Sequence, residues 1–172
     1  NVALNNKVSI SGAQAADGSS ADYITDGSLG RGFSSTGTET RFDVVLDMED
    51  SQWNKIHIVE GEPYNVASYE ISVSEDRRNW ETMHTEASLQ TQELKLDTDI
   101  GYRYLRLSVT GKVTAEAAVH LMEIEVFFEP SDAFRAEEDF KQVTVPSGLV
   151  TQNFSLPAVG AVYGSEFTWT SS

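Results

Sequence analysis

Short segments in which apolar and polar residues alternate constrain the fold of this chain more than any other feature of its sequence. In residues 42–47, for example, Phe42, Val44 and Leu46 occupy every second position. This period of two is that of a half-buried β-strand, because successive side chains of a strand point to opposite faces of a sheet. The same pattern predicts four further strands, at residues 55–59, 69–74, 105–109 and 122–126.

Helical periodicity is not sustained over three turns anywhere in the sequence. The nearest approach, residues 131–140, is short and acidic, and we interpret it as a connector with one helical turn. The predicted strands follow one another through turns such as 75–79 and 96–102, without the intervening helices of an α/β fold. The sequence therefore predicts an all-β protein with an antiparallel β-sandwich or jelly roll.

The balance of charges excludes whole classes of partner. The 172 residues include 12 Lys and Arg against 27 Asp and Glu, which gives a net charge of -15. A field of this sign repels phosphate backbones and anionic lipid headgroups. We therefore expect neither nucleic acid nor membrane lipid as a partner, whereas a neutral ligand such as a sugar is not disfavoured.

Motifs for catalysis and for metal binding are missing from the sequence. There is no cysteine, which excludes disulfides, thiolate metal sites and thiol nucleophiles but does not fix the compartment. The sequence has neither a GxSxG nor an HExxH motif, and its histidines, His57, His84 and His120, lack the spacing of zinc ligands. Carboxylate pairs are uninformative in so acidic a chain. We therefore expect no enzymatic activity.

Six segments, taken in order, resemble the F5/8 type C, or discoidin-like, domain, which includes carbohydrate-binding modules attached to bacterial glycoside hydrolases. They are NVALNNKVSISG, ITDGSLGRGF, FDVVLDMEDSQWNKIHIVE, SYEISVSEDRRNWETM, YRYLRLSVTG and HLMEIEVFF. For residues 1–129 the resemblance implies a galactose-binding-domain-like jelly roll whose loops at one end bind a ligand, most often a sugar. It also assigns Trp53 and Trp80 to the framework.

The composition changes after Phe128, where Pro130 and the acidic run 137–139 indicate a linker. Farther on, TQNFSLPAVG and FTWTSS are similar to the start of small bacterial Ig-like domains. We therefore predict a short β-rich segment at residues 130–172, with strands at 142–145, 151–156 and 166–170. Because unpaired strand edges must be covered, we expect this segment to pack on the first domain or to form a homo-oligomer with another copy of the chain.

The resemblance places three loops, residues 34–41, 60–66 and 111–118, at the ligand-binding end. The galactose-binding branch of the family typically has a histidine and an arginine there. Ser34 and Gly61 stand at those two positions in this sequence. Galactose specificity is therefore not carried over to this chain.

The middle loop, EGEPYN, and the start of the strand at residue 42 offer the candidate ligand-binding residues. Glu60 can accept hydrogen bonds from sugar hydroxyls, Tyr64 can stack on a pyranose ring, and Asn65 can both donate and accept. Arg41 is a further candidate. In the alternative interpretation, Tyr64 packs on its own loop, Glu60 caps a backbone turn, and Arg41 pairs with nearby carboxylates.

The turn ITDGSLGRGF lies where relatives often hold a structural calcium ion. Asp26 and Glu123 match two of the implied ligands, but Ser28 and Arg31 occupy the other two positions. We favour no metal here and no required cofactor: the guanidinium of Arg31 takes the place of the ion by pairing with Asp26 or Glu123. The alternative is a structural calcium held by Asp26, Glu123 and backbone carbonyls.

These features predict a non-catalytic carbohydrate-binding module of a secreted or surface-attached multidomain bacterial carbohydrate-active protein. Its partners would be a glycan and the neighbouring domains of the parent protein. The alternative function is a structural spacer that packs on a neighbouring catalytic domain and binds no glycan.

Overall fold

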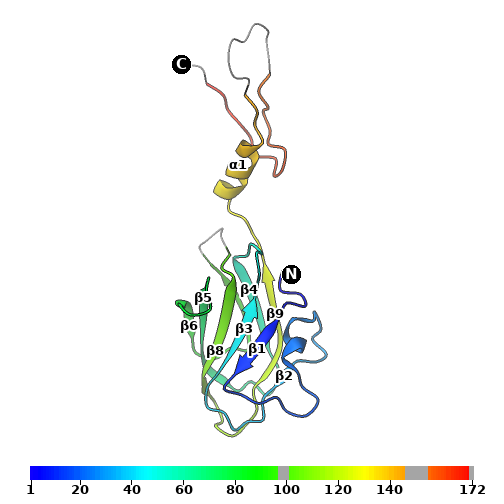
Figure 1. Cartoon of the computed structure of the whole chain (residues 1–172), viewed down its shortest axis with the longest axis vertical. Coiled ribbons are helices and arrows are strands. Elements are labelled where there is room, and N and C mark those ends of the chain that lie inside the picture. The colour runs from blue at the N-terminus through cyan, green and yellow to red at the C-terminus, as the bar shows by residue number, and fades with distance from the viewer. Residues whose placement is uncertain (97–100, 146–154, 171–172) are drawn as a thin grey trace. The chain divides into compact units, whose positions relative to one another are not determined.

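The computed structural model describes residues 1–96, 101–145 and 155–170 of the chain (Figure 1). The chain divides into two compact units, Asn1–Glu129 and Pro130–Ser172. Strands dominate the first unit, whereas the described residues of the second unit include a helix. No helix within the described ranges has both the length and the apolar character needed to cross a membrane.

Two antiparallel sheets form the first unit (Figure 1). The five-stranded sheet has the order β1-β3-β8-β5-β6 and the four-stranded sheet has the order β2-β9-β4-β7. A short 3-10 helix, η1 (Ala21–Thr25), contacts β9. The strands are β1 (Val8–Ser11), β2 (Phe33–Ser34), β3 (Phe42–Asp47), β4 (Lys55–Glu60), β5 (Val66–Ser74), β6 (Glu81–Glu86), β7 (Thr91–Lys95), β8 (Tyr104–Lys112) and β9 (His120–Phe127).

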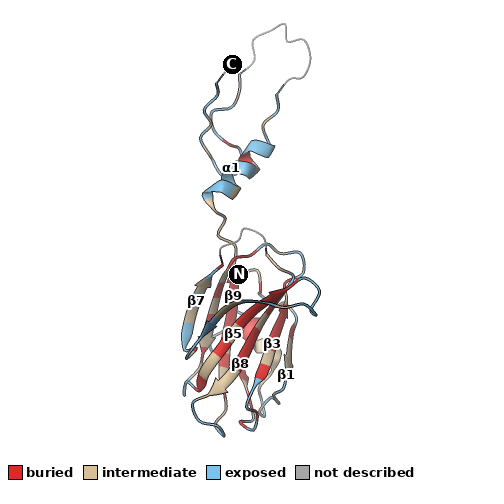
Figure 2. Ribbon diagram, turned by 90° about the vertical axis from the view of Figure 1, so that its left-hand side faces the viewer, coloured by how far each residue is buried: buried red, intermediate tan, exposed pale blue. Residues whose placement is uncertain are grey.

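The hydrophobic core consists of the inward-facing side chains of these strands. In β4, Ile56 and Ile58 are buried, whereas the alternate residues Lys55 and His57 are only partly buried. Figure 2 shows the buried residues concentrated along the strands of this unit. Trp53 is fully buried in the core. The predicted all-β antiparallel sandwich is therefore confirmed.

The strands that alternation predicted are the interior strands β3, β4, β5, β8 and β9. The four strands that it did not predict, β1, β2, β6 and β7, all lie at the edges of the two sheets. Edge strands have a neighbour on one side only, and β6 and β7 contain no fully buried residue. The sequences of β6 and β7 consequently lack the strong alternation of half-buried strands. In β1 the alternation is present but covers only four residues.

In the second unit a helix, α1 (Asp132–Lys141), replaces the predicted connector with one helical turn. Ser131 caps its first turn, since its Oγ accepts a hydrogen bond from the amide of Phe134 at 3.1 Å. A capping serine followed by good helix formers such as Ala136 and Glu137 stabilises ten helical residues without a long amphipathic pattern. The prediction of a single turn was therefore wrong.

The buried carboxylate of Asp139 organises the described part of the second unit. It accepts hydrogen bonds from three backbone amides, those of Val162, Tyr163 and Ser165, at 2.7 to 2.8 Å. These bonds hold the pKa of Asp139 well below its usual range, although burial opposes the shift. A turn of the chain is thus fixed by one side chain of the helix and not by a strand ladder.

The strands predicted for this unit are not found where the structure describes it. Residues 142–145 form no strand, and the segment 166–170 contributes only the bridge between Glu166 and Val159. The predicted strand at 151–156 falls largely on residues 151–154, which lie outside the described residues. The described residues therefore do not show the β-rich, Ig-like character expected from the sequence.

Candidate ligand-binding end

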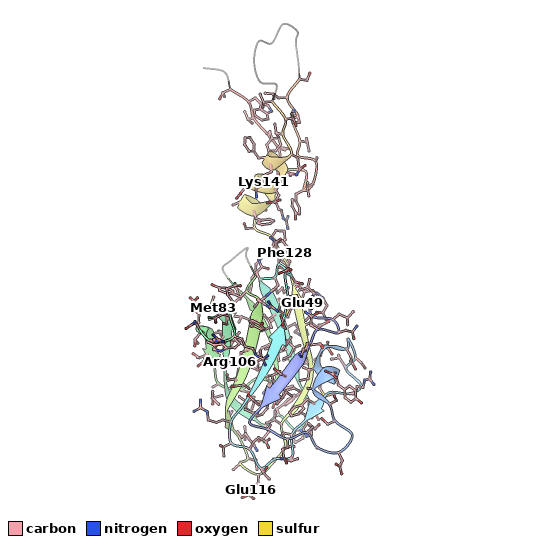
Figure 3. All side chains as sticks on the ribbon, in the orientation of Figure 1. Glu49, Met83, Arg106, Glu116, Phe128 and Lys141 are labelled. Atoms are coloured by element: carbon pink, nitrogen blue, oxygen red, sulfur yellow. The ribbon has the colours of Figure 1, made fainter. Side chains whose placement is uncertain are left out.

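Three loops lie together at one end of the first unit. They connect β2 to β3 (residues 35–41), β4 to β5 (residues 61–65) and β8 to β9 (residues 113–119), and are called the binding-end loops below. The amide of Val113 donates to the carbonyl of Asn65 at 2.9 Å, which joins the second loop to the third. Figure 3 shows Glu116 of the third loop at the opposite end of this unit from Phe128.

Lys112 holds the first binding-end loop against the end of β8. Its side chain is 2% exposed, and its ammonium group donates to the carbonyls of Gly37 and Glu39, both at 2.9 Å. The carboxylate of Glu39 is also buried, lies 3.8 Å from the same ammonium group and has no hydrogen-bond partner. Sequence reasoning missed this ion pair because 73 residues separate its partners.

Glu60, which was predicted to bind sugar hydroxyls, is engaged within the protein. The residue is 2% exposed. Its Oε1 accepts hydrogen bonds from the amides of Asn65 and Val66 at 2.6 and 2.7 Å, and its Oε2 accepts one from Gln90 at 2.9 Å. The alternative interpretation, in which Glu60 caps a backbone turn, describes this geometry.

Asn65 has a structural role of the same kind. It is 3% exposed, and its Nδ2 donates to the carbonyls of Thr114, Ala117 and Ala118 at 2.9 to 3.2 Å. Its Oδ1 accepts a hydrogen bond from the amide of Thr114 at 2.7 Å. Glu60 and Asn65 therefore shape the binding-end loops and offer no exposed polar group to a ligand, which corrects the roles predicted for their side chains.

Tyr64 remains accessible at this end, with 45% of its surface exposed. Arg41 is exposed as well, at the residue before β3. The pKa of Glu70 is lowered mainly by hydrogen bonds from Ser72 and Thr82, with smaller contributions from the charges of Arg106 and Arg41. Arg41 thus has a carboxylate neighbour, as the alternative interpretation expected.

Ser34, which stands where the galactose-binding branch has its histidine, lies beside a histidine from another strand. Its Oγ is 2.7 Å from Nδ1 of His120 on β9. The amide of Gly61 donates to the carbonyl of His120 at 2.7 Å, so the second binding-end loop starts next to this pair. Sequence reasoning treated His120 only as an isolated strand residue, because its partner is 86 positions away.

In the turn ITDGSLGRGF, Arg31 pairs with Asp26 as hypothesised from the sequence. Its Nε lies 2.5 Å from Oδ2 of Asp26, and its guanidinium group lies 4.4 Å from the centre of the Tyr23 ring. The amide of Gly27 donates to Oε1 of Glu123 at 3.2 Å, which ties the turn to β9. Burial raises the pKa of Glu123 to about 7.

Most of the carboxylate oxygens around this turn are engaged within the protein. Oδ1 of Asp26 accepts a hydrogen bond from the amide of Ser28 at 2.8 Å, and Oδ2 is paired with Arg31. Only Oε2 of Glu123 is a buried carboxylate oxygen without a partner here, whereas calcium binds several anionic oxygens. Within the described ranges, no three His, Asp or Glu side chains are grouped as metal ligands.

Three hollows in the surface of the first unit lie away from the binding-end loops. One of about 480 Å³ lies on the outer face of the four-stranded sheet, where Lys55 contacts Glu129 and Glu93, and His57 contacts Glu125. A second, of about 330 Å³, lies beside the turn between β5 and β6. The third is small, about 40 Å³, and is lined partly by basic residues.

Solved structures of carbohydrate-binding modules share this fold. The chain is 23% identical to chitosan-binding module 1 of a chitosanase/glucanase from Paenibacillus sp. IK-5, with a TM-score of 0.65 over 74% of this chain and 98% of that one. It is 21% identical to a Clostridium perfringens protein solved with GalNAc-β-1,3-galactose, with a TM-score of 0.60 over 72% and 95%.

A third relative is the C-terminal domain of a chitobiase from Bacteroides fragilis, 18% identical, with a TM-score of 0.62 over 75% of this chain and 97% of that one. At such low identities these structures show the shared fold. Comparison with curated proteins gives no match. The profile of the F5/8 type C domain matches residues 7–124. Because that match spans more than half of the sequence, the chain belongs to the F5/8 type C domain family.

Proposed function

We propose that this chain is a non-catalytic carbohydrate-binding module that binds a glycan through the binding-end loops. The observation that carries the proposal is the exposed ring of Tyr64, which lies on a loop that hydrogen bonds of Glu60 and Asn65 hold in place. An aromatic ring on a rigid loop can stack on a sugar without a large loss of conformational entropy on binding. The family, together with one solved relative that binds chitosan and another solved with GalNAc-β-1,3-galactose, supports the same ligand class.

Binding in this proposal combines stacking with hydrogen bonds. The ring of Tyr64 covers the apolar face of a pyranose, and exposed polar side chains of the binding-end loops contact its hydroxyls. These polar side chains include Thr36, Thr38, Glu62, Thr114 and Glu116. Binding requires no proton transfer and no metal. We further propose that the module is secreted or displayed on a bacterial surface as part of a carbohydrate-active enzyme.

A glycan array of plant, host and microbial sugars tests this function, and a variant tests the site. Tyr64→Ala should weaken the binding of any array ligand by roughly tenfold, the loss expected for one aromatic contact. Leu29→Ala is the control, because Leu29 is also an exposed apolar residue but lies in the turn ITDGSLGRGF. Equal affinities of the wild type and Tyr64→Ala would contradict ligand binding at the binding-end loops.

The second candidate function is a structural spacer that binds no glycan. It is favoured by the internal hydrogen bonds of Glu60 and Asn65, which leave this end with fewer polar ligand groups than the sequence predicted. If the folded, monodisperse protein binds no sugar of the array, this result would support the structural spacer and contradict the carbohydrate-binding module.

A further inference from the structure

The hollow of about 330 Å³ combines aromatic and acidic side chains and has no basic residue in its lining, whereas basic residues line the other two hollows described above. It lies between the turn after β5 and the segment leading into β8. The lining side chains used in this argument are Glu75, Asp76, Asn79, Trp80, Glu81 and Tyr102. Two aromatic rings with nearby carboxylate and amide groups are the combination by which proteins hold sugars.

Trp80, which the sequence assigned to the framework, is half-buried and held in place from one side. The guanidinium group of Arg106 on β8 (labelled in Figure 3) lies 4.3 Å from the centre of its ring. Arg106 is itself held by Ser72, whose Oγ accepts a hydrogen bond from its Nη2 at 3.2 Å. The orientation of the indole is thus set before any ligand arrives, which lowers the entropic cost of stacking on it.

Every charged side chain that lines this groove is acidic. Asp76 is engaged in its own turn, where it accepts hydrogen bonds from the amides of Arg78 and Asn79, both at 2.8 Å. Glu75 and Glu81, in contrast, are exposed, and Oε2 of Glu81 accepts a hydrogen bond from the hydroxyl of Tyr102 at 3.4 Å.

Both glutamates act on the same hydroxyl group. Burial raises the pKa of Tyr102, and the charges of Glu81 and Glu75 raise it further. The two carboxylates therefore place negative charge beside the hydroxyl group of Tyr102. In the other two hollows, acidic residues are accompanied by Lys55 and His57 or by Lys7 and Arg77.

We propose that this groove is a second binding site, specific for an oligosaccharide that carries free amino groups. Trp80 and Tyr102 contact the sugar rings, and Glu75 and Glu81 bind the ammonium groups. The site is separate from the binding-end loops and does not depend on ligand binding there.

The test is calorimetric titration of the full chain with a glucosamine trimer at low ionic strength, where charge pairing is least screened. The N-acetylated trimer is the ligand control, since it has the same rings without the charge. Glu75→Gln combined with Glu81→Gln should weaken binding of the glucosamine trimer by about tenfold or more. Asp17→Asn with Asp22→Asn is the matched control, because it removes the same charge from exposed positions of the N-terminal segment.

We expect the wild type, the control variant and Tyr64→Ala to bind the glucosamine trimer. The groove variant should lose affinity for this trimer while its melting temperature stays unchanged. Failure of the wild type to bind this trimer would overturn the proposal, as would equal affinity of the groove variant. Loss of binding only in Tyr64→Ala would also overturn it, and would place the amino sugar at the binding-end loops.

Discussion

Glu123 on β9 combines burial with incomplete hydrogen bonding. The residue is 2% exposed; Oε1 accepts a hydrogen bond from the amide of Gly27, whereas Oε2 has no partner. Desolvation disfavours the charged form of such a group. Its pKa is accordingly raised from 4.5 to about 7.

The stability of the first unit should therefore fall as the pH rises through this range. Between pH 4.5 and about 7 the folded protein keeps a proton on Glu123 that the unfolded chain has already lost. The stabilising contribution is complete below pH 4.5 and is lost as the pH rises through 7. The difference in pKa corresponds to about 3 kcal/mol in the free energy of unfolding.

Urea unfolding of the wild type and of Glu123→Gln at pH 5 and pH 8, both in EDTA, measures this effect. Glutamine has nearly the same shape and does not titrate, so the stability of the wild type relative to the variant should drop between the two pH values. Parallel pH profiles of the two proteins would show that Glu123 titrates normally.

The pair of Arg31 and Asp26 leads to a prediction about calcium. We expect the melting temperature to be the same in EDTA and in millimolar calcium, because the guanidinium group occupies one carboxylate of the turn. Arg31→Ala should cost less than about 1 kcal/mol, since the arginine side chain is 58% exposed and the pair is screened by solvent. A large rise in melting temperature with calcium would contradict the hypothesis that Arg31 takes the place of the ion. It would support a calcium site at this turn.

The sequence predicts the contacts of some single residues but not those of others. Asp26 and Arg31 are five positions apart, so that their pairing could be predicted. Glu60 and Asn65 were identified as polar loop residues, but a sequence does not show whether such side chains face a ligand or the backbone of their own loop. Buried backbone amides need hydrogen-bond acceptors, and in these loops the side chains of Glu60 and Asn65 supply them. Of the three residues predicted in the middle loop, Tyr64 is the one that stays exposed.

At the scale of the elements, the strands that the sequence pattern predicts are those with a neighbouring strand on each side. Each predicted strand has neighbours on both sides, and each strand that was missed is an edge strand. In β6 and β7 the polar residues Glu81, Thr85 and Glu93 face solvent, as expected of edges that must not recruit another sheet. Helix α1 was underestimated for a different reason, since a serine cap and helix formers stabilise it without a wide apolar face.

The three binding-end loops should depend on the buried pair of Lys112 and Glu39. Lys112→Met leaves the carboxylate of Glu39 buried without a partner, which should lower the free energy of unfolding by about 3 to 5 kcal/mol. Adding Glu39→Leu removes the unpaired charge and should recover most of that loss. Urea denaturation of the wild type, the two single variants and the double variant measures the coupling. Additive losses in the double variant would show that the two groups do not interact.

At the scale of the whole molecule, the two compact units have separate sources of stability. All of the core residues of the sandwich lie within the first unit. The described part of the second unit instead uses Asp139 and contacts among Phe140, Phe167 and Trp169. The expectation that the second unit packs on the first domain or mediates a homo-oligomer stays a prediction.

A fragment of residues 1–129 should therefore fold alone. We expect its melting temperature to lie within a few degrees of that of the first unit in the full chain, the shift associated with a change below about 1 kcal/mol. Calorimetry of both proteins measures this, and light scattering of the same samples tests whether only the full chain self-associates. A fragment that melts without cooperativity would show that the sandwich needs residues 130–172.

The central claim, that this F5/8 type C domain binds a glycan at the binding-end loops, is tested most directly by NMR titration of the isotope-labelled chain. The ligands should be a panel of neutral, acidic and amino oligosaccharides. We predict that at least one of them shifts the amide signals of Glu62, Tyr64 and Thr114 in a saturable manner, while the signals of β3 in the sheet interior stay in place. Unchanged signals at these three residues with every member of the panel would contradict the claim.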